Sequence, residues 1–203
     1  GYKECGEYHF EAKKLYAKHF EHADATMPKV FISQLLTKEF SAEVQTIISK
    51  IVDAIDPELV AKQDFLYSGK SWNITSDEYK TLLAESEYAA WLAAWGYRAN
   101  HFTVSVNHLA NFNDVESVNA SLKESGFTLN ASGGEVKGGE EVKLAQSSTI
   151  ADKVTVQFSD QALEIPSCFY EFAKRYPLAN GELYTGFVAA SADKIFESTN
   201  AAA

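Results

Sequence analysis

The amino-acid sequence predicts an α+β protein in which strand-rich segments lie on either side of a helical one. Residues 2–36 and 101–172 contain short runs rich in aromatic and β-branched residues, some with two-residue alternation. Residues 41–95 instead place apolar residues at helical spacing. The chain has 203 residues, of which 46% are hydrophobic, and this is enough for one large domain or two small ones.

The first 40 residues are expected to supply most of a small antiparallel sheet. Its three predicted strands are Tyr2–Phe10, Lys14–His22 and Pro28–Leu36. Three histidines lie in this segment, and their spacing is unlike that of a compact metal site. We interpret them as packed or solvent-facing strand residues: His9, His19 and His22.

Two helices are predicted between Ser41 and Gly96. Ser41 can cap the first helix, which extends to the break at Pro57. Its apolar stripe consists of Val44, Ile47, Ile48, Ile51, Val52 and Ile55. Thr75 and Glu78 form a capping-box pattern at the start of the second helix, which Gly96 can end.

A strand with two different faces is predicted next, within Gly96–Asn107. Its apolar face holds Phe102, Val104 and Val106, and its polar face holds His101, Thr103, Ser105 and Asn107. Such a strand suits a sheet that packs on helices behind and lines a polar cavity in front. His101 is therefore a candidate metal ligand.

The rest of the chain continues the α+β pattern. A helix is expected from about residue 113 to 126, with strands near 127–130, 143–148, 153–158 and 165–172. The glycine-rich stretch 133–139 lacks the strand–turn–helix context of a phosphate loop, so we interpret it as a hairpin turn.

This order of elements predicts a division into four segments. From His101 onward the order is strand, helix and then further strands, and the first 40 residues supply only the last three strands of the same unit. The predicted segments are 1–40 as the remainder of a first module without its first strand and helix, 41–96 as a helical insertion, 97–176 as a second βαβββ module, and 177–203 as a C-terminal extension.

Composition and charge exclude several classes of function. The net charge of -10 argues against nucleic-acid binding, which needs clustered Lys and Arg. No apolar run reaches the roughly 20 residues that cross a bilayer. Cys5 and Cys168 show no disulfide-framework spacing, so we expect a cytoplasmic protein with a small-molecule ligand and no membrane partner.

Glu171 is the second candidate metal ligand. It lies inside an otherwise apolar and aromatic run, where burying a carboxylate is costly unless it is paired or bound to a metal. Residue spacing leaves three interpretations open: metal binding together with His101, a position at the sheet edge that is open to water, or a salt bridge to Lys174, Arg175 or Lys137.

Several longer motifs resemble those of a known family. They are Asn-His-Phe-Thr-Val-Ser-Val at 100–106, Gly-Gly-Glu-Val-Lys-Gly at 133–138, Gln-Ser-Ser-Thr at 146–149, Pro-Ser-Cys-Phe-Tyr-Glu-Phe-Ala-Lys-Arg-Tyr at 166–176, and Gly-Phe-Val-Ala-Ala-Ser-Ala-Asp-Lys-Ile-Phe-Glu-Ser-Thr at 186–199. With shorter stretches at 6–10 and 85–93, they resemble the 2-oxoadipate dioxygenase/decarboxylase family, also called D-2-hydroxyglutarate synthase, within the vicinal-oxygen-chelate superfamily.

The resemblance implies a fold and a metal site. The fold consists of paired βαβββ modules whose mixed sheet curls around iron(II), which is bound by two histidines and one glutamate. By motif, His101 is one of these histidines and Glu171 is the glutamate. The family's other histidine and a substrate-binding arginine lie on a first strand that this sequence lacks, so we expect them upstream of Gly1. An alternative gives the role of third ligand to His9.

The resemblance also implies a reaction. An Fe(II)-dependent dioxygenase and decarboxylase would convert 2-oxoadipate, or a similar 2-oxoacid, and O2 to 2-hydroxyglutarate and CO2. The candidates for contacts with the substrate or with the ligands are Lys137, Gln146, Ser148 and Arg175. Two other classes stay open: a hydrolase, isomerase or lyase that uses zinc or another divalent metal on the same scaffold, and a non-catalytic binding domain.

Overall fold

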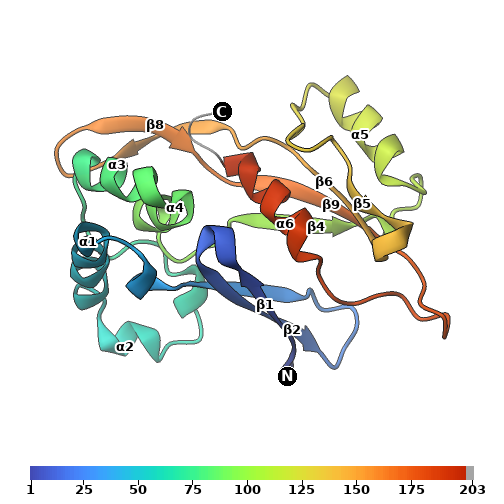
Figure 1. Cartoon of the computed structure of the whole chain (residues 1–203), viewed down its shortest axis with the longest axis horizontal. Coiled ribbons are helices and arrows are strands. Elements are labelled where there is room, and N and C mark those ends of the chain that lie inside the picture. Colours follow the sequence, from blue (N-terminus) through green and yellow to red (C-terminus); the bar gives the residue numbers. More distant parts are fainter. Residues whose placement is uncertain (200–203) are drawn as a thin grey trace. The chain divides into compact units, whose positions relative to one another are not determined.

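The computed structural model describes residues 1–199 and divides into two compact units, each built from separate stretches of chain (Figure 1). The first unit contains residues 1–34, 101–150 and 169–198, and the second contains residues 35–100 and 151–168. The division differs from the four predicted segments, because residues 151–168 of the predicted second module fall in the helical unit.

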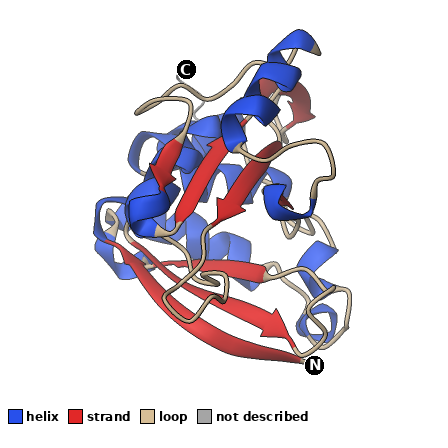
Figure 2. Ribbon diagram, turned by 90° about the vertical axis from the view of Figure 1, so that its right-hand side faces the viewer, coloured by secondary structure: helices blue, strands red, loops and turns tan. Residues whose placement is uncertain are grey.

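The first unit begins with the predicted three-stranded sheet, and its strand order is β1-β2-β3. Its strands are β1 (Tyr2–Phe10), β2 (Leu15–His22) and β3 (Val30–Leu35). The long antiparallel pair β1 and β2 starts at the N-terminus (Figure 2). Its register shifts between Glu4 and Gly6, which leaves Cys5 as the extra residue of a β-bulge.

The second sheet of this unit is mixed. Its order is β4-β9-β6-β5, with β4 and β9 parallel and the other pairs antiparallel. The strands are β4 (His101–Ser105), β5 (Lys137–Gly139), β6 (Leu144–Ser148) and β9 (Phe169–Arg175). Phe102, predicted to be packed, is 65% exposed, and its register partner Tyr170 on the inner strand β9 is 52% exposed, so this face of the sheet is open to solvent at that point.

Two helices cover parts of the first unit. They are α5 (Val115–Glu124) and α6 (Ala189–Phe196). Helix α5 contacts β6 and β9, and its buried Val115 and Val118 join Val106 and Ala145 in a small apolar core. Helix α6 contacts β1 of the first sheet and both β5 and β6 of the second, and thereby connects the two sheets (Figure 1).

The second unit is mainly helical. Its elements are α1 (Ala42–Asp53), α2 (Pro57–Val60), α3 (Ser76–Glu85), α4 (Glu87–Trp95) and the antiparallel hairpin of β7 (Lys153–Gln157) and β8 (Ala162–Pro166). One apolar cluster joins the predicted stripe of α1 to α3, α4 and the hairpin. The indole N–H groups of Trp91 and Trp95 donate to the carbonyl oxygens of Ser167 and Pro166, at 2.7 and 2.9 Å.

Four predicted elements differ in the structure. The stretch 133–139, predicted as a hairpin turn, ends in strand β5, and the turn to β6 follows at 140–143. The second predicted helix is two helices, because Ser86 is extended and its hydroxyl caps α4 by accepting from the Ala89 N–H at 3.1 Å. The predicted strand 165–172 is divided at residues 167–168, and its halves join different units. Residues 127–130 form only one bridge, from Leu129 to Thr149, because β6 ends at Ser148.

The structure confirms the α+β class with a mixed sheet. Within residues 1–199, no helix is long and apolar enough to cross a membrane.

Candidate metal centre

Glu171 lies at the centre of the mixed sheet. Strand β9 runs between β4 and β6, and the register places Thr103 on one side of Glu171 and Ser148 on the other. Residues of three strands can therefore converge on one carboxylate, which is only 3% exposed. A carboxylate this deeply buried needs partners.

Three side chains contact the Glu171 carboxylate. His101 Nε2 lies 3.2 Å from Oε2, and the Thr103 hydroxyl donates to the same oxygen at 3.2 Å. The Gln146 amide donates to Oε1 at 2.5 Å. The His101 ring also stacks on Phe169, with ring centroids 4.6 Å apart. The structure thus brings together His101, Glu171 and Gln146, which the sequence singled out separately.

The surroundings of Glu171 favour its charged form. Burial raises the pKa of the carboxyl. Hydrogen bonds from His101, Gln146 and Thr103, together with the charge of His101, lower it by more than burial raises it, so the pKa lies below its ordinary value. Glu171 is therefore a carboxylate at neutral pH, which is the form that binds metals.

The geometry fits a shared metal ion. Two ligand atoms about 3 Å apart can bind one ion at about 2.1 Å each, and His101 Nε2 and Glu171 Oε2 meet this condition. Gln146 adds a second observation. Among the side chains that the structure describes, its Oε1 is the one buried polar atom without a hydrogen-bond partner, although its Nε2 is bonded to Glu171. Such an atom can accept a hydrogen bond from a bound molecule.

Arg175 lies on the same face of β9 as Glu171, four residues further on. Its Nη1 donates to the carbonyl oxygens of Tyr184 and Gly186, at 3.0 and 2.6 Å, and its guanidinium lies 5.3 Å from the Phe187 ring centroid. Burial lowers the pKa of the guanidinium, while the Glu171 charge acts in the opposite direction. Arg175 stays cationic, and its Nε and Nη2 have no acceptor in the described part of the chain.

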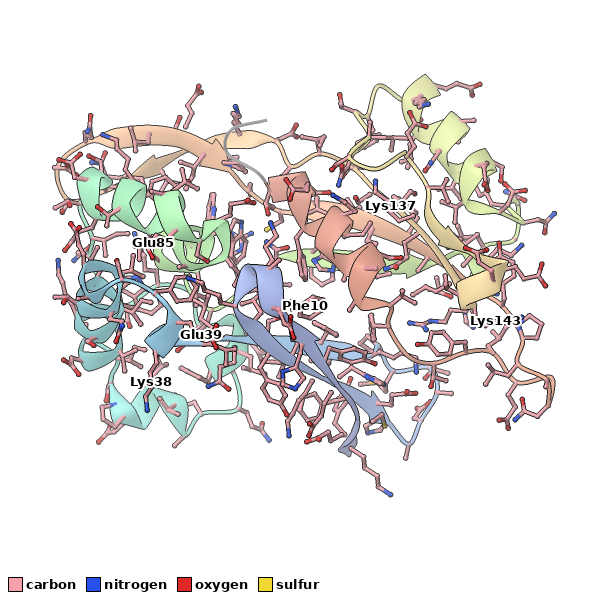
Figure 3. The ribbon with its side chains drawn as sticks, in the orientation of Figure 1. Phe10, Lys38, Glu39, Glu85, Lys137 and Lys143 are labelled. Carbon is pink, nitrogen blue, oxygen red and sulfur yellow. The ribbon has the colours of Figure 1, made fainter. Side chains whose placement is uncertain are left out.

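Lys137 and Ser148 serve other contacts in the structure. Lys137, labelled in Figure 3, is 4% exposed, and its Nζ donates to the Asn130 carbonyl oxygen at 2.5 Å. The Ser148 hydroxyl lies 2.8 Å from that of Ser198. These contacts hold the sheet and the segment around α6 together.

Sequence reasoning missed one partner of Glu171 and left one alternative open. Thr103 was placed on the polar face of its strand but was not selected, although its two-residue distance from His101 is the signal that identifies it. His9 is exposed, and its ring lies against Tyr16 with centroids 5.1 Å apart. This position does not favour His9 as the third ligand.

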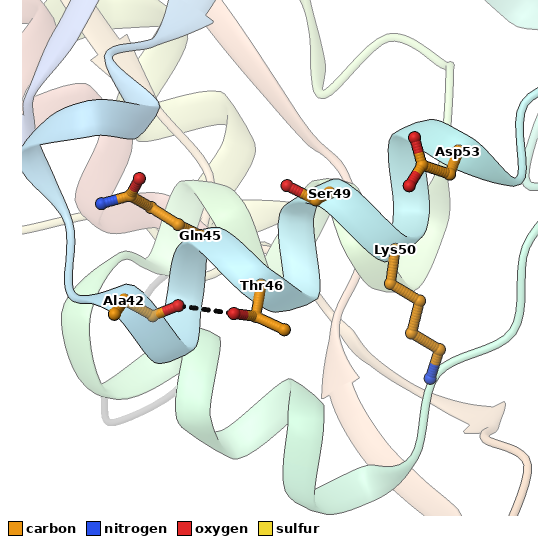
Figure 4. Close-up of a pocket in the computed structure, with 6 residues that line it drawn as sticks. All are labelled: Ala42, Gln45, Thr46, Ser49, Lys50 and Asp53. Atoms are coloured by element: carbon orange, nitrogen blue, oxygen red, sulfur yellow. Dashed lines mark hydrogen bonds between the residues drawn. The ribbon is translucent and has the colours of Figure 1, made fainter.

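A shallow polar groove follows α1 in the second unit (Figure 4). It is lined by Ala42, Gln45, Thr46, Ser49, Lys50 and Asp53. The Thr46 hydroxyl is already bonded to the Ala42 carbonyl oxygen at 2.8 Å, and the lining has no histidine or cysteine. The groove therefore has fewer side chains suited to metal binding or catalysis than the surroundings of Glu171.

The fold, with its mixed sheet, has relatives among proteins of known structure. The structure resembles that of a glyoxalase-superfamily protein from Ralstonia eutropha JMP134, with a TM-score of 0.73 and 22% identity over 92% of this chain and 65% of that one. The family is narrower. This chain belongs to the 2-oxoadipate dioxygenase/decarboxylase family, whose sequence profile matches residues 1–182.

Individual relatives agree with this assignment. The chloroplastic 2-oxoadipate dioxygenase/decarboxylase of Arabidopsis thaliana is 35% identical over 98% of this chain and 61% of its own length. This chain thus spans about three fifths of the curated relatives that it matches. The hydroxyglutarate synthase of Oryza sativa, solved with 2-oxoadipate, has a TM-score of 0.88 and 34% identity over 98% of this chain and 72% of that one.

A crystal structure from Shewanella frigidimarina NCIMB 400 is more similar still. It has a TM-score of 0.90 and 62% identity over 93% of this chain and 74% of that one, and its protein is described as a hydrolase.

Proposed function

We propose that this chain forms the larger part of an iron(II)-dependent dioxygenase and decarboxylase, which converts 2-oxoadipate and O2 to 2-hydroxyglutarate and CO2. The observation that carries the proposal is the contact between His101 on the edge strand β4 and Glu171 on the neighbouring strand β9, at 3.2 Å, in a chain that belongs to this family. Bound iron would supply the activation of O2.

The protein would hold the metal through His101 Nε2 and Glu171. Thr103 and Gln146 donate to the two oxygens of the carboxylate and so would hold it in one orientation toward a metal. Stacking on Phe169 restrains the His101 ring in the same way. A third ligand, a histidine, remains a prediction, because no second histidine contacts Glu171 among the described residues.

Arg175 would bind the far carboxylate of the substrate. Four residues along a strand separate Arg175 from Glu171 by about 13 Å between Cα atoms. Their two side chains and an extended six-carbon diacid can bridge this distance. Between them lies Ala173, which has the smallest side chain on this face of β9. The two carbonyl contacts of Nη1 fix the guanidinium, so Nε and Nη2 would present a ready fork to a carboxylate.

Substrate turnover after anaerobic loading with iron(II) tests the proposal. We expect the full-length protein to release CO2 from 2-oxoadipate only when O2 is admitted. Glu171→Gln should lose both iron and activity. Glu164→Gln, a change at an exposed position of the β7–β8 hairpin, should keep both. Full turnover by Glu171→Gln would contradict the proposal.

The same assay separates a second candidate. The description of the Shewanella protein favours a hydrolase that uses zinc or another divalent ion to activate water. Such an enzyme would need no O2 and would release no CO2 from 2-oxoadipate. Metal-dependent ester or amide cleavage under anaerobic conditions would support this class instead.

A further inference from the structure

A second group of metal-binding side chains lies on the first sheet, away from Glu171 in the sequence. The thiol of Cys5, one ring nitrogen of His19 and one carboxylate oxygen of Glu21 all lie within 4.8 Å of one another. Sequence spacing did not indicate this group, and His19 was interpreted as a packed or solvent-facing residue. We propose that Cys5, His19 and Glu21 form a separate binding site for a thiolate-preferring divalent ion such as zinc.

The β-bulge at Cys5 brings the three residues together. His19 and Glu21 are two residues apart on β2 and so share one face. The partner strand β1 shifts register between Glu4 and Gly6, and the extra residue is Cys5. A bulge redirects a side chain that regular pairing would place elsewhere, and here it adds a thiol to a face that already holds an imidazole and a carboxylate.

His19 is held in the orientation that a metal ligand needs. Its ring is 2% exposed, its Nδ1 lies 2.8 Å from the Tyr8 hydroxyl, and its Nε2 lies 3.1 Å from Glu21 Oε1. The Phe187 N–H donates to the same Tyr8 oxygen at 3.2 Å, which fixes that hydroxyl. A polar partner on one ring nitrogen is the usual support of a histidine that binds a metal through the other.

Gly6 makes this arrangement possible. A Cβ atom at this position would lie 2.8 Å from His19 Nδ1 and 2.9 Å from the Tyr8 hydroxyl oxygen, closer than real contacts allow. Any other residue would therefore displace the ring or break its bond to Tyr8. Gly6 offers a way to disturb the site without removing a ligand.

The ligand set indicates the kind of ion. Glu21 Oε2 is paired with Lys29, which leaves Oε1 to face His19. One thiolate, one imidazole and one carboxylate suit zinc, with a fourth position for water. Because Cys5 is exposed, an ion can reach the site from solvent. None of these residues contacts Glu171, although Arg175 interacts electrostatically with both Glu21 and Glu171. A change at Glu171 therefore leaves all three proposed ligands in place.

Cobalt(II) is the probe, because a cobalt–thiolate bond gives a strong near-ultraviolet absorption band. The full-length protein carrying Glu171→Gln is titrated under reducing conditions, so that the other centre does not contribute. We expect one cobalt per chain with the thiolate band, and loss of the band when zinc is added. Cys5→Ser should abolish the band, while Cys168→Ser should leave it unchanged. Gly6→Ala should weaken cobalt binding about 10–100-fold.

Two results would overturn the proposal. One is the absence of a thiolate band in the protein with Cys5 intact. The other is a band that survives Cys5→Ser or disappears with Cys168→Ser. Circular dichroism of each variant shows whether it is folded, and Glu21→Gln supplies a second test that leaves the cysteine in place. A purely structural role for the contacts of His19 and Glu21 predicts the first of these results.

Discussion

Replacing Gln146 by Met should weaken metal binding while leaving the stability of the metal-free protein nearly unchanged. Gln146 is 3% exposed, and its amide Nε2 donates to Glu171 while its Oε1 has no partner among the described residues. Methionine has a similar length and no hydrogen-bonding groups of this strength. The change therefore removes the favourable hydrogen bond to Glu171 and, at the same position, the unfavourable buried oxygen that has no partner.

The two effects on stability have opposite signs. Loss of a hydrogen bond to a charged group costs about 1.5–3 kcal/mol, and removal of a buried unpaired acceptor returns about 1–3 kcal/mol. The free energy of unfolding should thus change by less than about 2 kcal/mol. Metal binding depends on the orientation of Glu171, and loss of such a supporting contact lowers affinity about 10–100-fold. This equals about 1.4–2.8 kcal/mol, in agreement with the hydrogen-bond value.

Urea unfolding of the metal-free protein and anaerobic titration with iron(II) measure the two quantities. Gln157→Met, at an exposed position of β7, is the matched control and should alter neither. The reasoning is refuted if the Gln146 variant binds iron as tightly as the original protein. It is also refuted if the variant loses more than about 3 kcal/mol of stability with no change in iron affinity.

Three further changes test other parts of the structure. Arg175→Lys should raise the KM for 2-oxoadipate about 10-fold or more, because a lysine cannot form two parallel hydrogen bonds to a carboxylate. The KM for a monocarboxylic 2-oxoacid should change much less. Equal changes for the two substrates in steady-state assays would exclude the assigned contact. Leu82→Ala in the helical core should cost about 2–5 kcal/mol in urea unfolding, whereas Leu66→Ala at a 55% exposed position should cost under about 0.5 kcal/mol. Ser86→Ala should lower stability by about 1 kcal/mol through loss of the cap of α4, and thermal unfolding beside Ser49→Ala, on the exposed face of α1, checks this value.

Local signals explain how much of the helical unit could be predicted. The caps at Ser41 and Thr75 involve bonds that close within three residues, so the sequence alone indicates them. Ser86 was missed because apolar residues continue at helical spacing on both sides of it. The division at Ser167 and Cys168 was missed for the opposite reason. The first half pairs with the neighbouring β7 in a hairpin, but the second half pairs with β4 and β6, which lie much earlier in the sequence.

The candidate centre shows the same limit. His101 and Glu171 could be selected one at a time, from alternation and from a charge in an apolar run. Their contact depends on the parallel register of β4 and β9, which no short motif encodes. The site at Cys5 is harder to predict, because the bulge that creates it changes the face of a single residue. Gly6, a glycine inside a strand, is the local signal that marks such a bulge.

The interleaving of the two units has a consequence for synthesis on the ribosome. Strand β9, which lies between β4 and β6, follows them by more than 60 and by about 20 residues, and the β7–β8 hairpin is likewise made long after the helices that it joins. Neither unit can close until the β7–β8 hairpin and β9 have emerged, because each unit includes one of them. Until β9 pairs with β4, the apolar surfaces of β4 and α4 stay exposed and can associate with other chains. We therefore expect the nascent protein to depend on chaperones.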